Sequence, residues 1–395
     1  MNRRLSGAFA LLALVPVGVK CQRDADVPSL AGLEQHPGVR QEEVGAVADN
    51  PDCAAQVYAM RDGRQRQRVP CVYAWGPVLA DHTHVYLGGI GHHSAWIPPS
   101  RYDPVTRQTE PFRVTGAHGR WALAAMDDEV FYVLSCYQYD LVGAPPCEME
   151  TSSIVVRSKD PVDDSFRVVV DYLPMNSVMA VAVDESNVYW LGQSYWKDEA
   201  ATAMVYALVV MSVAKDGSGR PRYIVPPQED AATAVSDAMV VLGQSLFWIG
   251  GHWPAFYGLS RAAKDGVGFE QVLASDVYDL ETHDGRLLVC RNSDVLALDE
   301  EGTHQQVLFS AKAGGFQSIA AHGDEIYVAV RRAARGRIPR LSVFAFGPDG
   351  LTREVYESPD DTSTELVLGA GEVGSFIIDT AQDMMYVDFD EAGTR

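Results

Sequence analysis

Two stretches of the sequence share one pattern and decide the fold: VAVDESNVYWLG (residues 181–192) and MVVLGQSLFWIG (residues 239–250). Each is a short apolar segment, a polar turn and a second apolar segment that contains aromatic residues. Neither shows the spacing of apolar residues that an amphipathic helix requires. The pattern therefore predicts pairs of strands joined by tight turns.

The same pattern occurs five more times along the chain. The further copies are VLADHTHVYLGG (78–89), ALAAMDDEVFYV (122–133), LETHDGRLLVC (280–290), IAAHGDEIYVAV (319–330) and LGAGEVGSFIID (368–379). The second strands recur about every 48 residues, a period typical of repeat architectures. A length of 395 residues is therefore better explained by one large repeat domain than by two or three unrelated domains.

A second strand pair follows most of these pairs. Its turn contains Asp-Gly at 216–217, 265–266 and 349–350, and glycine accepts the positive φ that such turns need. Each unit then contains four strands, A to D, as in one blade of a β-propeller. The predicted fold is all-β: a seven-bladed β-propeller of four-stranded antiparallel blades, with six or eight blades as alternatives.

The ends of the chain bear on how such a ring closes. The last unit ends after a third strand, MMYVDFDEAG (384–393), and RQRQRVPCVY (64–73) is placed to supply its outer strand. Closure of this kind removes an open sheet edge. AAQVYAMRDG (54–63) also reads as a strand, and the sequence leaves the place of this surplus strand open.

The N-terminal residues predict export. Arg3 and Arg4 precede an uncharged run, residues 7–19, which is shorter than the roughly 20 apolar residues of a membrane-spanning helix and fits a signal peptide. We predict a signal peptide over residues 1–20, a flexible polar tether over 21–52 and the propeller domain over 53–395. The expected location is the cell envelope, periplasmic or outer-surface, or the medium.

Cys21 follows the apolar run directly, and here the chain resembles a bacterial lipoprotein signal. The resemblance implies that Cys21 becomes the lipidated N-terminus. Lys20 departs from the family pattern, which has a small residue before the cysteine. The alternative is cleavage elsewhere, with loss of Cys21.

The remaining cysteines agree with an oxidising compartment. Cys53 with Cys71, and Cys136 with Cys147, are two local pairs that predict disulfides, although sequence alone does not establish their connectivity. Cys290 lies in the apolar run LLVC and is predicted to be a buried free thiol.

In the motifs VAVDESNVYW and VMSVAKDG, over about residues 53–395, the chain resembles secreted bacterial β-propeller repeat proteins, TolB-like and NHL-like in style. The resemblance implies a fold and does not select an activity, because such a group includes scaffolds, partner-binding proteins and enzymes.

Aromatic residues gather in the predicted B–C loops, which form one face of a propeller together with the D–A links. Aromatic side chains in loops are typical of partner-binding surfaces, and packing against neighbouring loops is the alternative. The candidates are Trp96, Tyr137, Tyr139, Tyr195, Trp196, His252, Trp253, Phe256 and Tyr257.

Five arginines occupy residues 331–340, RRAARGRIPR. Arginine binds carboxylates and phosphates through paired hydrogen bonds, so Arg331, Arg332 and Arg335 join the partner-binding candidates. A solvated loop, or pairing with the chain's own acidic residues, is the alternative.

No metal site, cofactor or catalytic set is predicted. His92 and His93 are weak metal candidates, because the strand that begins at Val85 separates them from Asp81 and His84. The Asp-rich turns at 127–128, 184–185 and 324–325 lack the calcium-loop pattern and are explained by turn geometry.

The formal net charge of −21 argues against nucleic-acid binding, which needs a cationic face. We therefore expect a non-enzymatic, exported β-propeller, monomeric and membrane-tethered as a lipoprotein, that binds an envelope protein or glycan through its loop-rich face. Contact with the membrane is expected only through a lipid on Cys21. The alternative is a hydrolase or lyase acting on a polysaccharide or peptide at the mouth of the channel.

Overall fold

The chain divides into two units, residues 1–40 and 41–395, and all residues described below belong to the second. The computed structural model describes residues 55–59, 65–70, 78–87, 100–111, 121–135, 153–160, 166–170, 177–197, 204–228, 234–251, 258–274, 276–291, 294–310, 315–332, 340–347, 352–357, 366–371, 374–379 and 384–389. The predicted signal peptide and tether lie outside these ranges. In the described part, no helix is long and apolar enough to cross a membrane.

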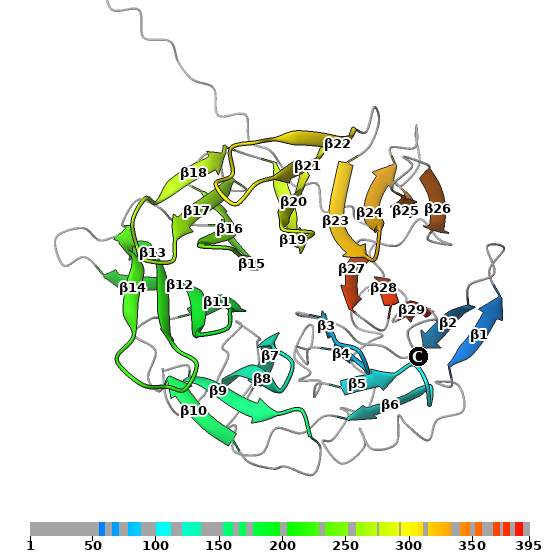
Figure 1. Ribbon diagram of the computed structural model, residues 1–395, viewed down its shortest axis with the longest axis horizontal. Helices are drawn as coiled ribbons and strands as arrows, with labels where there is room; N and C mark the ends of the chain where they lie inside the picture. Colours follow the sequence, from blue (N-terminus) through cyan, green and yellow to red (C-terminus); the bar gives the residue numbers. More distant parts are fainter. Residues whose placement is uncertain are drawn as a thin grey trace, which may run out of the picture. The chain divides into compact units, whose positions relative to one another are not determined.

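Seven antiparallel sheets form a ring, which confirms the predicted seven-bladed β-propeller (Figure 1). Within each of the first six blades the four strands follow one another in chain order, from strand A at the channel to strand D at the outside. Blade 1 contains β3 (Val78–Ala80), β4 (Val85–Leu87), β5 (Ser100–Asp103) and β6 (Gln108–Pro111); blade 2 contains β7 (Trp121–Met126), β8 (Val130–Ser135), β9 (Ser153–Ser158) and β10 (Phe166–Val170); blade 3 contains β11 (Ser177–Val183), β12 (Asn187–Lys197), β13 (Met204–Ala214) and β14 (Arg222–Gln228).

The same order continues through the next three blades. Blade 4 contains β15 (Ala234–Leu242), β16 (Ser245–Gly251), β17 (Leu259–Ala263) and β18 (Glu270–Leu273); blade 5 contains β19 (Val277–His283), β20 (Arg286–Arg291), β21 (Asp294–Leu298) and β22 (Gln306–Ser310); blade 6 contains β23 (Gly315–His322), β24 (Glu325–Arg332), β25 (Arg340–Phe346) and β26 (Thr352–Glu357).

The seventh blade joins the two ends of the propeller domain. Its strands, from the channel outward, are β27 (Leu366–Gly371), β28 (Gly374–Asp379), β29 (Met384–Phe389), β2 (Gln65–Pro70) and β1 (Gln56–Ala59). The segment predicted to close the ring does so, because β2 pairs with β29 from Gln65–Phe389 to Pro70–Met384. The surplus strand also has its place: β1 is a fifth, outermost strand of this blade.

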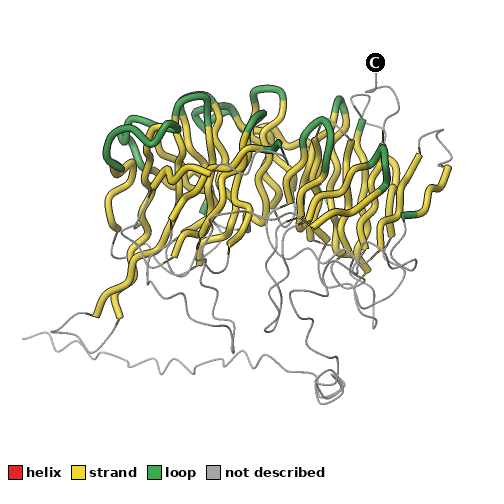
Figure 2. The backbone as a smooth tube through the Cα atoms, turned by 90° about the horizontal axis from the view of Figure 1, so that it is seen from below, coloured by secondary structure: helices red, strands yellow, loops and turns green. Residues whose placement is uncertain are grey.

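The A–B and C–D turns lie along one side of the ring, which we call the turn face (Figure 2). The predicted Asp-Gly turns are confirmed at Gly217 and Gly266, whose φ values are +74° and +89°. Each of these glycine N–H groups donates to the carbonyl three residues earlier, at Ala214 and Ala263. Only glycine accepts such φ values at low cost, so these two positions set the C–D turns of blades 3 and 4.

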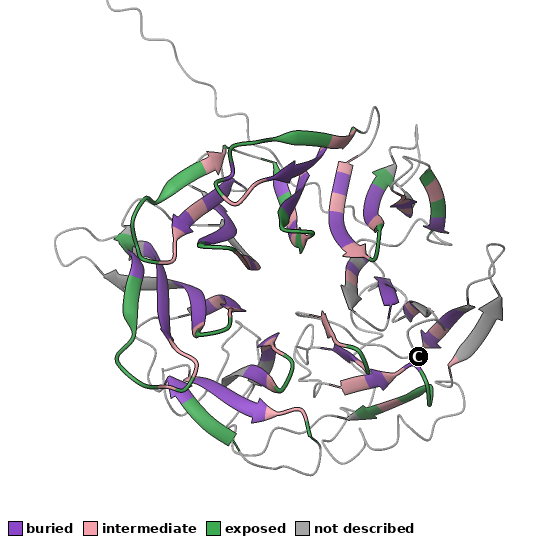
Figure 3. Ribbon diagram, viewed as in Figure 1, coloured by how far each residue is buried: buried purple, intermediate pink, exposed green. Residues whose placement is uncertain are grey.

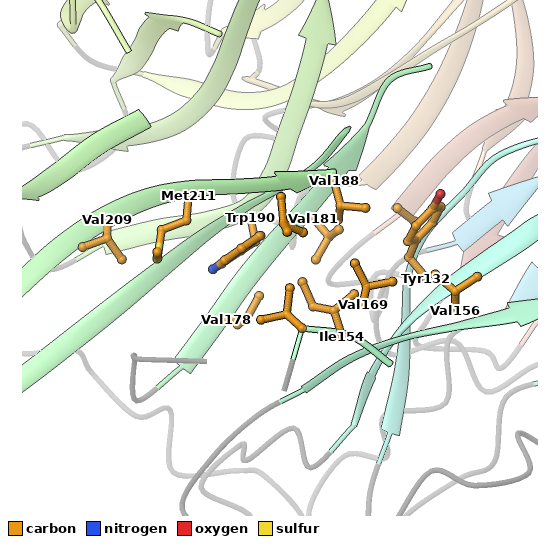
Figure 4. Packing of buried hydrophobic residues seen from close by; sticks show 13 residues of the cluster. Tyr132, Ile154, Val156, Val169, Val178, Val181, Val188, Trp190, Val209 and Met211 are labelled. Carbon is orange, nitrogen blue, oxygen red and sulfur yellow. The ribbon is translucent and has the colours of Figure 1, made fainter. Parts of the chain in front are cut away.

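The hydrophobic core lies between blades, because consecutive strand residues point to opposite sides of a blade. Trp190 packs with residues of blade 2, among them Ile154 and Val169, whereas its neighbour Tyr189 packs with Leu246 and Trp248 of blade 4, and Figure 4 shows the Trp190 cluster. The inner strands are mostly buried and the outermost strands mostly exposed (Figure 3). Each blade therefore depends on both neighbours for burial of its apolar side chains.

Strand β2 also makes polar contacts to both sides of the closing blade. Arg66 donates to the carbonyl of Val355 in blade 6. The next residue, Gln67, is 2% exposed and faces blade 1; its Nε2 donates to the carbonyl of Pro104 at 2.7 Å, and its Oε1 accepts from the Tyr102 hydroxyl. Two adjacent residues thus fix the closing strand to the last and the first complete blades.

We expect Gln67→Ala to lower the free energy of unfolding by about 1–3 kcal/mol, because it leaves the buried Tyr102 hydroxyl and Pro104 carbonyl without this partner. Urea unfolding of the full chain, followed by tryptophan fluorescence, measures the change. The exposed Gln305→Ala is the matched control and should be neutral. Equal stability of the two variants would contradict a role for Gln67 in ring closure.

Candidate functional site

Most of the predicted binding residues lie outside the described residues. The partner-binding candidates outside them are Trp96, Tyr137, Tyr139, His252, Trp253, Phe256, Tyr257 and Arg335. The weak metal candidates His92 and His93 and the cysteines Cys21, Cys53, Cys71, Cys136 and Cys147 also lie outside them. The predicted disulfides and the lipidation of Cys21 therefore stay predictions. Cys290 is described, and it is buried and free as predicted.

The structure corrects the prediction that Tyr195 and Trp196 lie in a loop. Both belong to β12, where their backbones pair with Tyr206 and Val205 of β13. Pairing of β12 with β11 ends at Gln193, and pairing of β13 with β14 ends at Leu208. Cross-strand hydrogen bonding, and not a loop, therefore carries these two residues outward on a two-stranded hairpin.

This hairpin projects from the side of the ring opposite the turn face (Figure 2). That side contains the B–C ends of the strands, and we call it the loop face. Strands β12 and β13 have 11 residues each, whereas strands B and C of the other blades have three to eight. Strands β12 and β13 are thus the longest of the described B and C strands, and their hairpin lies on the predicted binding face.

The predicted arginine loop is also shorter than residues 331–340. Strand β24 continues to Arg332 and β25 begins at Arg340, with Arg332 opposite Arg340 in the ladder. Arg331 is exposed and lies opposite Leu341. Strand pairing therefore holds three of the five arginines at the B–C end of blade 6.

On the turn face, an Asp–Tyr–Lys cluster joins blades 3 and 4. Asp184 Oδ1 accepts from the backbone N–H groups of Ser186 and Asn187, both at 2.8 Å, and Oδ2 accepts from the Tyr189 hydroxyl at 2.9 Å. Lys264 of blade 4 lies 2.6 Å from the same Oδ2. Its ammonium group is 5.9 Å from the centroid of the Tyr189 ring, within the range of a cation–π contact.

The same cluster occurs at two more interfaces. Asp81 with Tyr86 joins blade 1 to Lys159 of blade 2, and Asp127 with Tyr132 joins blade 2 to Lys215 of blade 3. In all three copies the tyrosine follows the aspartate by five residues, and the lysine comes from the C–D turn of the next blade. The Asp-rich turns therefore do more than the predicted turn geometry: they hold neighbouring blades together.

At the interface between blades 4 and 5, the carboxylate comes from the later blade, whereas in the three copies above it comes from the earlier blade. Glu300 occupies in blade 5 the position that Lys264 occupies in blade 4, and its carboxylate accepts from the backbone N–H of Gln244 in the A–B turn of blade 4. That turn has Gly243 and Gln244 where the A–B turns of blades 1 to 3 have an aspartate. The carboxylate packs directly on Gly243, where a Cβ would clash. In both arrangements, therefore, a carboxylate on one blade accepts from a donor group on the neighbouring blade.

Electrostatics agree with this structural role. Burial alone would raise the pKa of Asp184, but hydrogen bonds from Lys264, two backbone amides and Tyr189 outweigh burial and lower the pKa to about 2. The pKa of Asp81 and that of Asp127 are lowered by the same kinds of contact. A permanently ionised carboxylate with four donors is suited to stabilising structure rather than to transferring protons.

A second polar cluster lies between the inner strands of blades 5, 6 and 7. Asp279 Oδ2 accepts from the Ser318 hydroxyl at 2.7 Å and from the Ile319 N–H at 2.9 Å. The Ser318 oxygen in turn accepts from the N–H of Leu368 in blade 7. These contacts connect three consecutive blades next to the channel.

Glu281 lies two residues after Asp279 on the same strand and is partly buried. Burial, together with the charge of Asp279, raises the pKa of Glu281 to about 7, against the effect of one hydrogen bond from the Thr282 N–H. Burial and Asp279 also raise the pKa of the Cys290 thiol, which makes a reactive thiolate unfavourable. Glu281 is therefore a carboxyl group in this cluster that titrates near neutral pH.

Among the described residues, no group of three or more His, Cys, Asp or Glu side chains is arranged to hold a metal ion. Sequence reasoning missed both polar clusters. The Asp–Tyr spacing of five residues, repeated at 81–86, 127–132 and 184–189, is the signal that could have found the first. No local signal marks the second, because Asp279 and Ser318 are 39 residues apart.

Comparison with known proteins supports the fold alone. No protein-family model matches the chain, and no curated protein matches it. A puromycin hydrolase structure is similar with a TM-score of 0.52 and 14% identity, over 84% of this chain and 54% of that chain. Also similar is a puromycin-hydrolyzing peptidase of Mycobacterium tuberculosis, with a TM-score of 0.46 and 15% identity over 78% of this chain and 52% of that chain. A nidogen/laminin complex is similar with a TM-score of 0.42 and 13% identity, over 74% of this chain and 96% of that chain. The present chain thus spans about half the length of the two puromycin-hydrolysing proteins.

We expect Asp184→Ala to lower the free energy of unfolding by about 2–3 kcal/mol, because it removes a turn cap, a tyrosine partner and an ion pair together. In a double-mutant cycle with Lys264→Ala, the coupling energy should be about 1 kcal/mol. Urea unfolding measures both. Glu185→Ala, at the exposed neighbouring position, is the control and should be neutral; a coupling energy of zero would contradict the inter-blade contact.

The lowered pKa of Asp184 sets the sign of a pH effect. A carboxyl with a pKa of about 2 in the folded state and an ordinary value when unfolded stabilises the fold above its unfolded pKa, and this contribution disappears as the pH falls through the folded value. We expect Asp184→Asn to be less sensitive to acid than the unsubstituted chain between those two pKa values. Thermal unfolding across that pH range checks this.

For Glu281 the dependence of stability on pH has the opposite sign. A carboxyl with a raised pKa of about 7 contributes its full stability below its unfolded pKa and loses it as the pH rises through the folded value. We expect Glu281→Gln to raise the melting temperature by about 2–4 °C above neutral pH and to have little effect in mild acid. The exposed Glu301→Gln is the control. A shift of equal size at both pH values would contradict the assignment.

Proposed function

We propose that this chain is an exported, non-enzymatic β-propeller, tethered to an envelope membrane through a lipid on Cys21, that binds a protein or glycan partner through its loop face. The observation that carries the proposal is the β12–β13 hairpin. It extends past the last paired residues of β11 and β14 and carries Tyr195 and Trp196 with it.

Aromatic residues on a projecting hairpin support binding for a physical reason. Tyrosine and tryptophan supply large contact areas at low cost in conformational entropy, and they dominate the energetics of many interfaces. Two strands without further neighbours are also marginally stable in water. A bound partner would therefore stabilise the hairpin, and the hairpin would in turn supply contacts to the partner.

The contacts on the turn face support the same choice of face. There the aspartate carboxylates are already occupied by backbone amides, tyrosines and lysines of the next blade. Such groups are committed to holding blades together. The loop face, which carries the predicted aromatic and arginine residues, is the better candidate for a partner.

Site-specific photo-crosslinking on intact cells tests the proposal. With p-benzoylphenylalanine in place of Tyr195, we expect one discrete adduct of the full chain, which is lost when Trp196→Ala and Trp253→Ala are added. The control site is Val267, 70% exposed on the opposite face, where no adduct is expected. The same adducts at both sites, or none at Tyr195, would exclude the loop face.

One observation favours a second candidate function, a hydrolase or lyase acting on a polysaccharide or peptide. A carboxyl group with a pKa near 7, such as that of Glu281, is suited to general acid–base catalysis. Its neighbour Asp279 is already bound by Ser318 and Ile319, which ranks this function second. Glu281→Gln would abolish hydrolysis of envelope polysaccharide or peptide by the full chain if this function holds, and would leave partner binding intact.

A further inference from the structure

Blade 5 differs from the other blades at one pair of facing residues in its two inner strands. There Glu281 of β19 lies opposite Leu288 of β20. In the other blades an apolar residue or a glycine on strand A lies opposite an aromatic residue on strand B. These six pairs are Leu79 with Tyr86, Ala125 with Tyr132, Ala182 with Tyr189, Val240 with Phe247, Ala320 with Tyr327 and Gly369 with Phe376. Of the seven pairs, only that of blade 5 contains an acid.

The side chain of Glu281 points toward blade 6, the neighbour of blade 5 in the ring (Figure 1). Alternate residues of a strand point to the same side, and Asp279, two residues before Glu281, binds Ser318 of blade 6. Leu280, between them, points to the other side and shares an apolar cluster with Phe247 of blade 4. Glu281 therefore lies in the interface between blades 5 and 6.

The surroundings of Glu281 on that side are apolar. Ala182, which takes the same place in blade 3, packs with Trp248 of blade 4. The residue of blade 6 at the corresponding position is Val328, which is buried in the apolar cluster between blades 5 and 6. An ionised carboxylate is costly to bury in such surroundings.

The charged groups around Glu281 do not offset this cost. Its neighbour Asp279 is an acid, and the hydrogen bond that Glu281 accepts comes from the backbone N–H of Thr282. Burial and the charge of Asp279 raise the pKa of Glu281 to about 7. Strand β16, which packs on β19, carries no ionisable residue, and the side chain of Asp237 in β15 lies outside the described residues. The other ionisable residues on strands packed against β19 are Arg286, Cys290 and Arg291 of β20 and His322 of β23.

Between blades 5 and 6 the Asp–Tyr–Lys cluster of the turn face cannot form. His283, Leu288 and Pro348 stand where blades 3 and 4 have the aspartate, the tyrosine and the lysine. Asp279 instead supplies a polar contact next to the channel, to Ser318. This interface therefore lacks the ion pair that joins each of blades 1 to 3 to the next blade.

Blades 2 to 5 have further contacts at the turn face, which secure the same residues a second time. Arginine side chains of blades 2, 3 and 4 donate to backbone carbonyls of the following blade: Arg167 to Lys215, Arg222 to Lys264 and Arg261 to Glu300. We therefore expect local opening of the ring between blades 5 and 6 before opening at these interfaces.

We propose that the interface between blades 5 and 6 is a pH-sensitive contact, which is closed while Glu281 is protonated and opens locally when Glu281 releases its proton to solvent. A carboxyl with a pKa of about 7 in the closed interface and an ordinary pKa when exposed favours closure below the ordinary value. This contribution is lost as the pH rises through about 7. The proposal needs neither a partner nor a lipid, so its test is independent of the proposed function.

Cys290 reports on this opening, because it is free and is buried in the same interface. A matched reporter is Leu191→Cys between blades 3 and 4, since Leu191 lies opposite Ala180 as Cys290 lies opposite Asp279. The full chain is labelled with 4,4′-dithiodipyridine, which reacts with thiols in mild acid, at concentrations where the rate is proportional to the reagent. Mass spectrometry of the labelled peptides gives the rate at each thiol.

We expect the labelling rate of Cys290 in the parent, divided by that in Glu281→Gln at the same pH, to rise roughly fiftyfold from pH 5 to pH 8. The ratio cancels the reactivity of the thiol itself. The exposed Glu301→Gln should label as the parent does, and the thiol of Leu191→Cys should show no such rise. An equal rise at both thiols would overturn the proposal, because it would mean global unfolding. A ratio at Cys290 that does not change with pH would overturn it too.

Discussion

Pairing of β2 with β29 is the interaction on which the rest of the structure depends. In the apolar clusters, side chains of two neighbouring blades pack together; between the ends of the ring, Tyr102 of blade 1 packs with Phe376 of blade 7. An open ring would therefore leave one face of blade 1 and one face of blade 7 in water. Closure by a strand from the other end of the domain removes both exposed faces at once. It also makes the first and last parts of the domain interdependent, with Arg66 and Gln67 fixing the strand to either side.

The interfaces between blades are chemically different although the blades share one architecture. Blades 1 to 4 are joined on the turn face by ionised aspartates and lysines, and blades 4 and 5 by Glu300, which accepts from the backbone N–H of Gln244. Blades 5 to 7 are joined near the channel by Asp279 and Ser318. A repeat protein divides its stability among such interfaces.

The two faces of the disk differ in the contacts that the structure describes. Short turns with fixed φ values and satisfied carboxylates make the turn face a structural surface. The loop face carries the arginines of blade 6 and the long hairpin of blade 3.

How far the sequence alone could lead is clear from particular residues. The seven copies of the strand-turn-strand pattern and Gly217 and Gly266 in their turns were predictable, because alternation and turn geometry depend on residues a few positions apart. The closing segment at 64–73 was predictable because the last unit lacks an outer strand, which would leave an open sheet edge. Tyr195 and Trp196 were predicted in a loop, since the sequence does not show where strand pairing ends.

Contacts across the interfaces were not predictable in this way. Asp184 and Lys264 are 80 residues apart, and Asp279 reads as an ordinary polar residue until Ser318 of the next blade is placed beside it. The sequence by itself determined the repeating unit, because each unit's hydrogen bonds are local. Only the tertiary structure decided which charges meet across the interfaces and where the surplus strand β1 lies, because these depend on how whole blades pack against one another.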